Sequence, residues 1–214
     1  ADALTAAGAK TLAIDPAMAF LFVERIRAAA PGVALVDAGP VVDGCRMIKS
    51  AAEIALMKQA MAMTLEVHRR AARILHEGIR ASEVIRFIDA AHRALGASTG
   101  NYFCAVQFGR STAFPHGLPQ DDVLRDGDVV LVDTGTLIDG YHSDITRTYA
   151  FGDVGDEVRR IWDIEKEAQA AAFAAVRPGV PCEAVDYAAR AVLERAGLGP
   201  DYRLPGLPHR TGHG

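Results

Sequence analysis

The chain has 214 residues, 50% of them hydrophobic, and a formal net charge of −4 at pH 7. A chain of this size folds into one or two domains with a sizeable buried core. Its acidic balance, without a basic block, argues against nucleic acids and anionic membrane surfaces as partners. Because no apolar stretch is long enough to span a membrane and residues 1–10 lack the order of a signal peptide, we expect a soluble cytoplasmic protein.

The cysteines Cys45, Cys104 and Cys182 are widely spaced and include no Cys-x-x-Cys pair. An odd number at such spacing predicts reduced thiols of an intracellular protein and not a disulfide framework. We expect all of them to be small buried residues.

The first part of the chain predicts a strand, a helix and a second strand. Residues 11–14 read as a short strand, and Asp15 followed by Pro16 fits a helix N-cap with proline at the first helical position. The helix is expected to reach about residue 30, and residues 33–37 form the second strand. This unit is too small to stand alone as a domain and contains no residues that suggest a ligand.

Two amphipathic helices are predicted next, over residues 50–78 and 82–96. The apolar positions of the first helix are Ile54, Met57, Met61, Leu65, Ala72 and Leu75. A stripe of this kind, rich in methionine at helical spacing, is expected to pack into the core. His68 and His76 fall on or near this helix without a second ligand type at matching spacing, and we expect them to be surface or interface residues.

Residues 128–149 predict a β-hairpin. An apolar run ends at Asp133, Asp139 and Gly140 form a two-residue turn, and residues 141–149 alternate in β-branched and aromatic side chains. This pattern reads as strand, turn and strand.

This hairpin places two carboxylates on one face. Asp133 lies opposite Thr146, which shares the face of Asp144 because side chains alternate along a strand. The carboxylates are then diagonal neighbours, about 7–8 Å apart at the backbone. Two anions this close repel each other unless a cation lies between them, and oxygen-ligated divalent cations fit that role. The alternative is a structural use, because aspartates often close strands and turns.

The neighbours of these carboxylates divide between the two faces. His142 shares the face of Asp144 and is a candidate cleft residue, whereas Tyr141 and Arg147 lie on the opposite face, where we expect them to pack or pair. Two more helices, over residues 156–176 and 182–196, follow. Helix pairs that alternate with hairpins indicate an α+β fold with an antiparallel sheet.

Three further motifs accompany the hairpin: Ser111-Thr-Ala-Phe-Pro-His116-Gly, Leu124-Arg-Asp-Gly-Asp128 and Pro208-His209-Arg-Thr-Gly-His213-Gly. In this order, the set resembles the metallopeptidases of the pita-bread fold. That superfamily includes Xaa-Pro dipeptidases (prolidases), Xaa-Pro aminopeptidases, methionine aminopeptidases and creatinase. The resemblance implies a pita-bread domain over residues 46–214, preceded over residues 1–45 by the C-terminal remnant of an N-terminal α/β domain.

The resemblance also implies roles for individual side chains. Asp133 and Asp144 match the first two metal-binding carboxylates, with Asp144 bridging two divalent cations (Mn, Co or Zn), and His213 matches the single histidine ligand. His116 and His209 match histidines that contact the substrate or the developing tetrahedral intermediate. In the family, two glutamate ligands follow the histidine, whereas this sequence ends at residue 214. We therefore expect a fragment cut at both ends and inactive by itself.

The implied activity is hydrolysis of Xaa-Pro peptide bonds by a hydroxide formed from water whose pKa the cations lower. The short unit before residue 46 and the motifs favour an Xaa-Pro dipeptidase or aminopeptidase over a methionine aminopeptidase, with Xaa-Pro dipeptides or short peptides as substrates, and we expect a homodimer. Two alternatives stay open. One is creatinase-type hydrolysis without metal ligands, against which the presence of Asp133, Asp144 and His213 argues. The other is a non-catalytic interaction module on the same fold.

Overall fold

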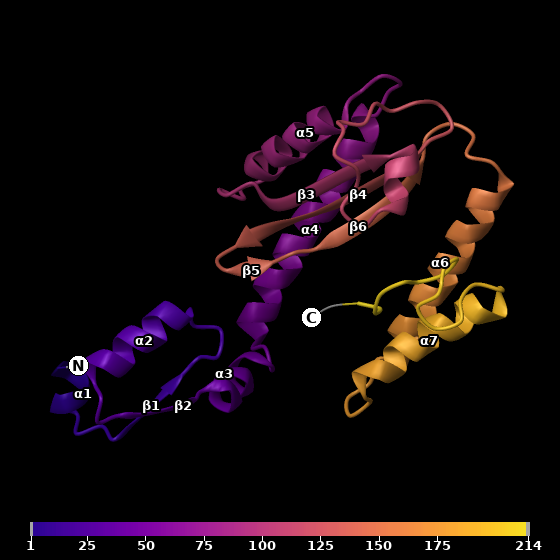
Figure 1. Ribbon diagram of the computed structural model, residues 1–214. Coiled ribbons are helices and arrows are strands. Elements are labelled where there is room, and N and C mark those ends of the chain that lie inside the picture. The colour runs from indigo at the N-terminus through magenta and orange to yellow at the C-terminus, as the bar shows by residue number, and fades with distance from the viewer. Residues whose placement is uncertain (1, 213–214) are drawn as a thin grey trace.

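The chain folds into an α+β structure, which the computed structural model describes over residues 2–212 (Figure 1). In chain order the elements are α1 (Asp2–Ala6), β1 (Thr11–Ile14), α2 (Phe20–Ala29), β2 (Ala34–Asp37), α3 (Gly39–Arg46), α4 (Ala51–Ile74), α5 (Ala81–Ala94), β3 (Asn101–Phe108), the 3₁₀ helix η1 (Gly109–Ala113), β4 (Val129–Ile138), β5 (Tyr141–His142), β6 (Ile145–Ala150), α6 (Asp156–Ala175) and α7 (Cys182–Arg195). The predicted fold class, α+β with an antiparallel sheet, is confirmed.

The N-terminal unit is a two-stranded parallel sheet whose strands β1 and β2 are connected by α2. The helix predicted from Pro16 begins later, at Phe20. The reason is local, because the Asp15 carboxylate accepts the backbone N–H of Ala17 at 2.8 Å and keeps this segment in a turn.

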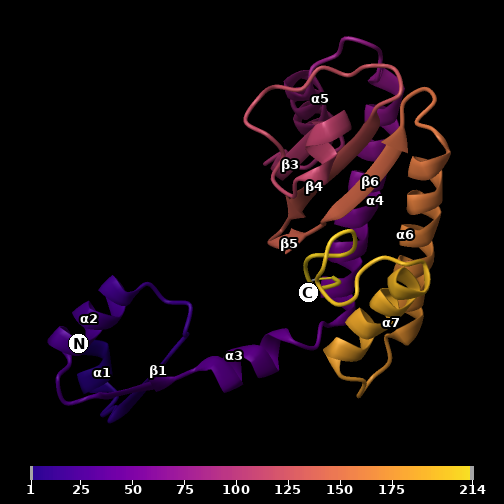
Figure 2. The same ribbon diagram turned by 45° about the vertical axis from the view of Figure 1, so that its right-hand side comes forward.

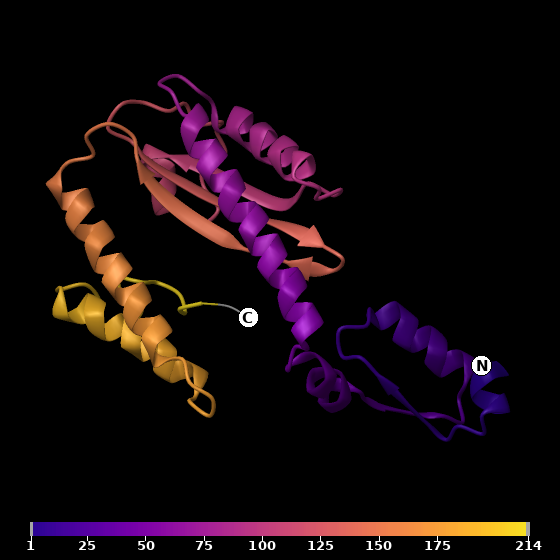
Figure 3. The ribbon, with the colours of Figure 1, turned by 180° about the vertical axis from the view of Figure 1, so that it is seen from behind.

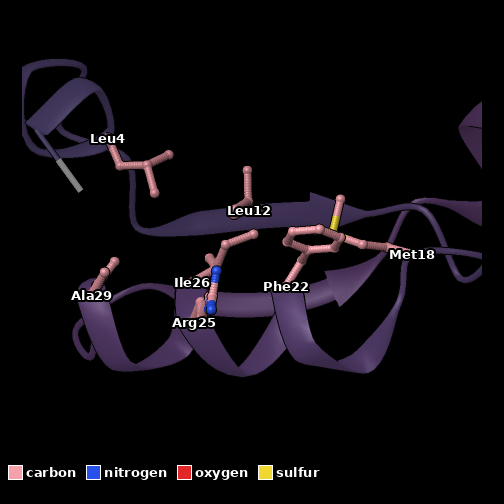
Figure 4. A pocket seen from close by; sticks show the side chains of 8 residues that line it. Leu4, Leu12, Met18, Phe22, Arg25, Ile26 and Ala29 are labelled. Carbon is pink, nitrogen blue, oxygen red and sulfur yellow. The ribbon is translucent and has the colours of Figure 1, made fainter.

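An apolar groove of about 510 Å³ lies in this unit (Figure 4). Leu12 of β1 faces Phe22 and Ile26 of α2 across it, and Met18 lies near one end. No residue of α2 is buried among the described parts of the chain, and Phe20 is 74% exposed. The described residues therefore leave this small unit open on one side.

Figures 1 and 2 both show the N-terminal unit standing apart from the larger sheet, with α3 leading from it to α4. The boundary expected between residues 45 and 46 falls at the end of α3. The division into two domains stays a prediction.

The long helix α4 begins at a capping box. The Ser50 hydroxyl accepts the N–H of Glu53 at 3.3 Å, and the Glu53 carboxylate accepts the N–H of Ser50 at 2.6 Å. The Tyr141 hydroxyl donates to the same carboxylate at 2.8 Å, which confirms that Tyr141 makes a structural contact. The helix ends at Ile74, earlier than predicted, because Leu75 is already extended.

The buried face of α4 differs from the predicted one. Ile54 is 42% and Met61 is 40% exposed, so these two positions of the predicted stripe are not core, whereas Leu75 packs against the core cluster. The buried residues are Ala60, Thr64, Val67, His68 and Ala71, which also keep helical spacing. His68 is 3% exposed and lies inside the fold, so the predicted surface or interface position is wrong for it, whereas His76 is exposed. Small side chains allow close packing on the sheet, and hydrogen bonds offset the cost of burying the polar ones.

In the larger antiparallel sheet, β3 and β6 flank β4, and β5 pairs with the end of β4. The helices α4 and α5 pack against the sheet, and Figure 3 shows α4 crossing one face. The core consists of Val67, Ala71, Ile79, Ala81, Val84, Ile88, Ala91, Val106, Phe108, Leu124, Val130 and Val132. Burial of each large side chain here contributes about 1.5–3 kcal/mol, so this core holds β4, the strand that carries Asp133.

The helices α6 and α7 pack against each other beside the sheet (Figure 1). Their contact is a separate small cluster formed by Ala168, Ala172, Ala189 and Val192. Both helices match the predicted ranges closely.

None of the helices described is both long and apolar enough to cross a membrane. All three cysteines are free, as predicted. Cys104 is partly buried, and burial raises the pKa of its thiol to about 11. Cys45 and Cys182 are exposed, so the prediction of burial is wrong for them.

Candidate metal centre

The hairpin that carries the carboxylates has the predicted turn and register. Asp139 and Gly140 have positive φ angles of 47° and 88°, as a two-residue type I′ turn requires. Across β4 and β6, Asp133 pairs with Thr146. The Thr146 hydroxyl donates a hydrogen bond of 2.7 Å to Oδ1 of Asp133, which is partly buried. This bond orients the carboxylate over the two strands.

The second arm of the hairpin is interrupted at the second carboxylate. Ser143 and Asp144 divide it into β5 and β6, so the continuous strand predicted over residues 141–149 is wrong at this point. Ser143 is 1% exposed and faces the core, whereas Asp144 is exposed. Asp144 is exposed where Ser143 is buried, and it lies two residues before Thr146, the partner of Asp133, so it lies on the outer side of the hairpin with Asp133.

Tyr102 of β3 lies beside both carboxylates. Burial raises the pKa of its hydroxyl, and the charges of Asp144 and Asp133 raise that pKa further. Its ring meets His142 edge-on, with 4.5 Å between the ring centroids. A Cβ atom at Gly135 would come within 2.7 Å of this ring, so glycine allows the close approach. Tyr102 is not among the site residues predicted from the sequence.

The donor atoms fit a divalent cation that accepts oxygen ligands. Carboxylates suit such cations, and a cation would neutralise the paired charge of Asp133 and Asp144. The predicted nitrogen ligand His213 lies outside the described residues. Within residues 2–212, no group of three or more His, Cys, Asp or Glu side chains is placed to hold a metal ion. Of the candidate metal site, the described residues therefore include the carboxylate pair Asp133 and Asp144.

The two predicted catalytic histidines lie in exposed loops. His116 lies in the loop after η1. The carbonyl of Pro115, the residue before it, accepts a hydrogen bond of 3.5 Å from the buried side chain of Gln107 in β3. Nδ1 of His209 lies 2.8 Å from the carbonyl oxygen of Arg210. The catalytic roles of both histidines stay predictions.

A buried arginine holds the loop that contains His209. Arg190 of α7 is 5% exposed and forms an ion pair of 2.8 Å with Asp186. It also donates to the main-chain carbonyls of Asp201, Leu207 and His209. Several charge-assisted bonds from one side chain therefore fix the path of this loop.

Asp186 completes the anchor. Its carboxylate accepts the backbone N–H of Thr211 at 2.8 Å as well as the bond from Arg190. Burial raises the pKa of Asp186, but the hydrogen bonds from Arg190 and Thr211 outweigh this effect and lower it to about 2. The pair is therefore fully charged at neutral pH.

Solved structures of peptidases share this fold. The dipeptidase PepE from Mycobacterium ulcerans is 39% identical in sequence, and the match covers 95% of this chain and 53% of that chain with a TM-score of 0.84. The match to the Xaa-Pro dipeptidase from Bacillus anthracis has 27% identity and a TM-score of 0.88, and it covers 100% of this chain and 59% of that chain. The fold and the order of its motifs define a metallopeptidase of the pita-bread class.

The chain belongs to metallopeptidase family M24, whose sequence profile matches residues 55–214. Among curated proteins, "Putative dipeptidase YkvY" of Bacillus subtilis (strain 168) is 37% identical over 194 residues, which are 89% of this chain and 51% of that protein. The chain thus spans about half the length of the curated relatives it matches.

Proposed function

We propose that the intact protein hydrolyses Xaa-Pro peptide bonds with the help of divalent cations, as an Xaa-Pro dipeptidase or aminopeptidase. The observation that carries the proposal is the pair Asp133 and Asp144 on one face of the hairpin, in a chain of family M24. The names of similar proteins, which include dipeptidases and an Xaa-Pro dipeptidase, support the same substrate class.

In this proposal each site residue has a defined part. Asp133, Asp144 and His213 would hold two divalent cations. When bound, the cations supply a water molecule of lowered pKa and polarise the scissile carbonyl. His116 and His209 bind the substrate and donate hydrogen bonds to the oxyanion that develops on its carbonyl. Mn, Co and Zn all accept carboxylate and imidazole donors, so each is a candidate.

The organisation of the whole protein belongs to the same proposal. Residues 1–45 end an N-terminal domain, and residues 46–214 belong to the catalytic domain. Assembly as a homodimer and a cytoplasmic location stay predictions from the sequence.

Peptide hydrolysis by the intact protein tests the proposal. We expect cleavage of Ala-Pro but not of Ala-Ala, and an Ala-Pro-Ala tripeptide separates aminopeptidase from dipeptidase activity. Exhaustive treatment with a chelator should abolish cleavage, and adding back Mn, Co or Zn one at a time should restore it. Activity that survives chelation would show that the metal assignment is wrong. Cleavage of creatine would favour the creatinase alternative, and metal binding without any hydrolysis would favour the interaction module.

A further inference from the structure

Two buried side chains of α4 hold the chain on both sides of Asp144. Oγ1 of Thr64 lies 2.7 Å from Oγ of Ser143, and Nε2 of His68 lies 2.9 Å from the carbonyl oxygen of Ile145. Thr64 and His68 are one helical turn apart, so they lie on the same face of the helix. Their partners, Ser143 and Ile145, are the residues directly before and after Asp144.

The contact at Ser143 is part of a buried hydrogen-bonded chain. Oγ of Ser143 accepts the backbone N–H of Thr136 at 2.9 Å, and Oγ1 of Thr64 lies 3.1 Å from Nε2 of His92. Thr64, His92 and Thr136 are 0% exposed. Water does not compete for these bonds, so they link α5, α4 and the hairpin rigidly.

The contact at Ile145 fixes the orientation of the His68 ring. A carbonyl oxygen only accepts hydrogen bonds, so Nε2 of His68 carries a proton and donates it to Ile145. Nδ1 of the neutral ring then accepts from the Tyr149 hydroxyl at 3.0 Å. Because both ring nitrogens have partners, rotation of the ring would break both bonds.

These anchors lie where the strand ladder is interrupted. The pairs between β4 and β5 end at His142, and those between β4 and β6 begin at Ile145. Within this gap the N–H of Ser143 donates to the carbonyl oxygen of Thr136 at 3.0 Å, and the contacts of Thr64 and His68 hold the residues on both sides of Asp144 from the helix. We propose that Thr64 and His68 are positioning residues that place the Asp144 carboxylate for metal binding. The inference rests on the proposed function, because it assigns Asp144 to the metal site.

Metal affinity of matched variants of the intact protein tests this inference. Thr64→Val removes the hydroxyl at nearly constant shape, and His68→Leu removes both ring bonds. His68→Gln keeps an N–H donor close to the position of Nε2. Val67→Ala is the control, because Val67 is a 0% exposed core residue on the same helix with no polar group to bond residues 143–145.

We would titrate Mn²⁺ by calorimetry and record Tm for each variant. Thr64→Val and His68→Leu are expected to raise the Kd about 10–100-fold, as loss of residues that orient metal ligands does. His68→Gln should recover most of the affinity. Val67→Ala should lower Tm without a change in Kd, which separates positioning from general stability.

The results have distinct meanings. If the parent protein binds Mn²⁺ and all variants bind it equally well, the positioning roles are wrong while the proposed function stands. The positioning roles are also wrong if the rise in Kd follows the loss of Tm across all variants and Val67→Ala fits the same trend. If the parent protein binds none of the ions Mn²⁺, Co²⁺ and Zn²⁺, both the proposed function and this inference are wrong.

Discussion

Replacing Asp144 with Asn is expected to lower kcat/KM for Xaa-Pro hydrolysis about a thousandfold. The amide keeps the shape of the side chain but lacks the negative charge proposed to hold the cations. Metal catalysis lowers the activation barrier by several kcal/mol, and each ~1.4 kcal/mol is worth about tenfold in rate. Metal content, measured by elemental analysis after dialysis, should fall together with activity.

Asp139→Asn is the matched control for this change. It replaces the same side chain in the same hairpin, and asparagine tolerates the positive φ of 47° at the turn. We expect activity and metal content close to those of the parent protein. His116→Ala and His209→Ala should lower turnover and leave the metal content intact. An Asp144→Asn protein with full metal content and full turnover would remove Asp144 from the metal site.

Arg190→Met should produce the largest loss of stability, about 3 kcal/mol in the free energy of unfolding, because it leaves the partly buried Asp186 carboxylate without its ion-pair partner. Denaturant titration measures this loss, and limited proteolysis should show new cleavage within residues 199–212. Arg195→Met is the control, since Arg195 and its partner Glu167 are 64% and 65% exposed. That exposed pair is worth at most about 1 kcal/mol. Equal stability losses in both variants would show that Arg190 does not anchor the loop.

The same pair gives a pH dependence with a defined sign. The folded-state pKa of Asp186, about 2, lies below its ordinary value of 3.8. Its ionised form therefore stabilises the fold above pH ~4, and a contribution of about 2 kcal/mol is lost as the pH falls from about 4 to 2. The parent protein and Arg195→Met should both lose this stability in acid, whereas Arg190→Met should lack this part of the pH dependence.

The hairpin could be predicted because its signals are local. Asp139 and Gly140 favour the positive φ angles of a two-residue turn, and the turn sets the register that brings Asp133 opposite Thr146. The interruption at Ser143 could not be read from this pattern. There the Ser143 hydroxyl accepts the N–H of Thr136, which a regular strand pair would give to the Ser143 carbonyl, and Thr64 contacts the same hydroxyl from α4.

The parts that the sequence did not predict depend on tertiary contacts. The strand β3, over Asn101–Phe108, lacks the alternation of a half-buried strand, although its apolar run is typical of a buried one. Tyr102 was therefore not placed beside the carboxylates. The prediction for His68 considered only the hydrophobic pattern of the helix, in which a polar side chain is expected outside the core. In the fold its bonds to Ile145 and Tyr149 make burial favourable.

Anomalous diffraction from crystals of the intact protein grown with Mn²⁺ would locate the bound cations. We expect two manganese peaks that contact Asp133 and Asp144, with Asp144 shared between them and His213 bound to one. Manganese sites elsewhere in the protein, or no peak at the carboxylates under conditions that support Xaa-Pro hydrolysis, would contradict the proposed metal site.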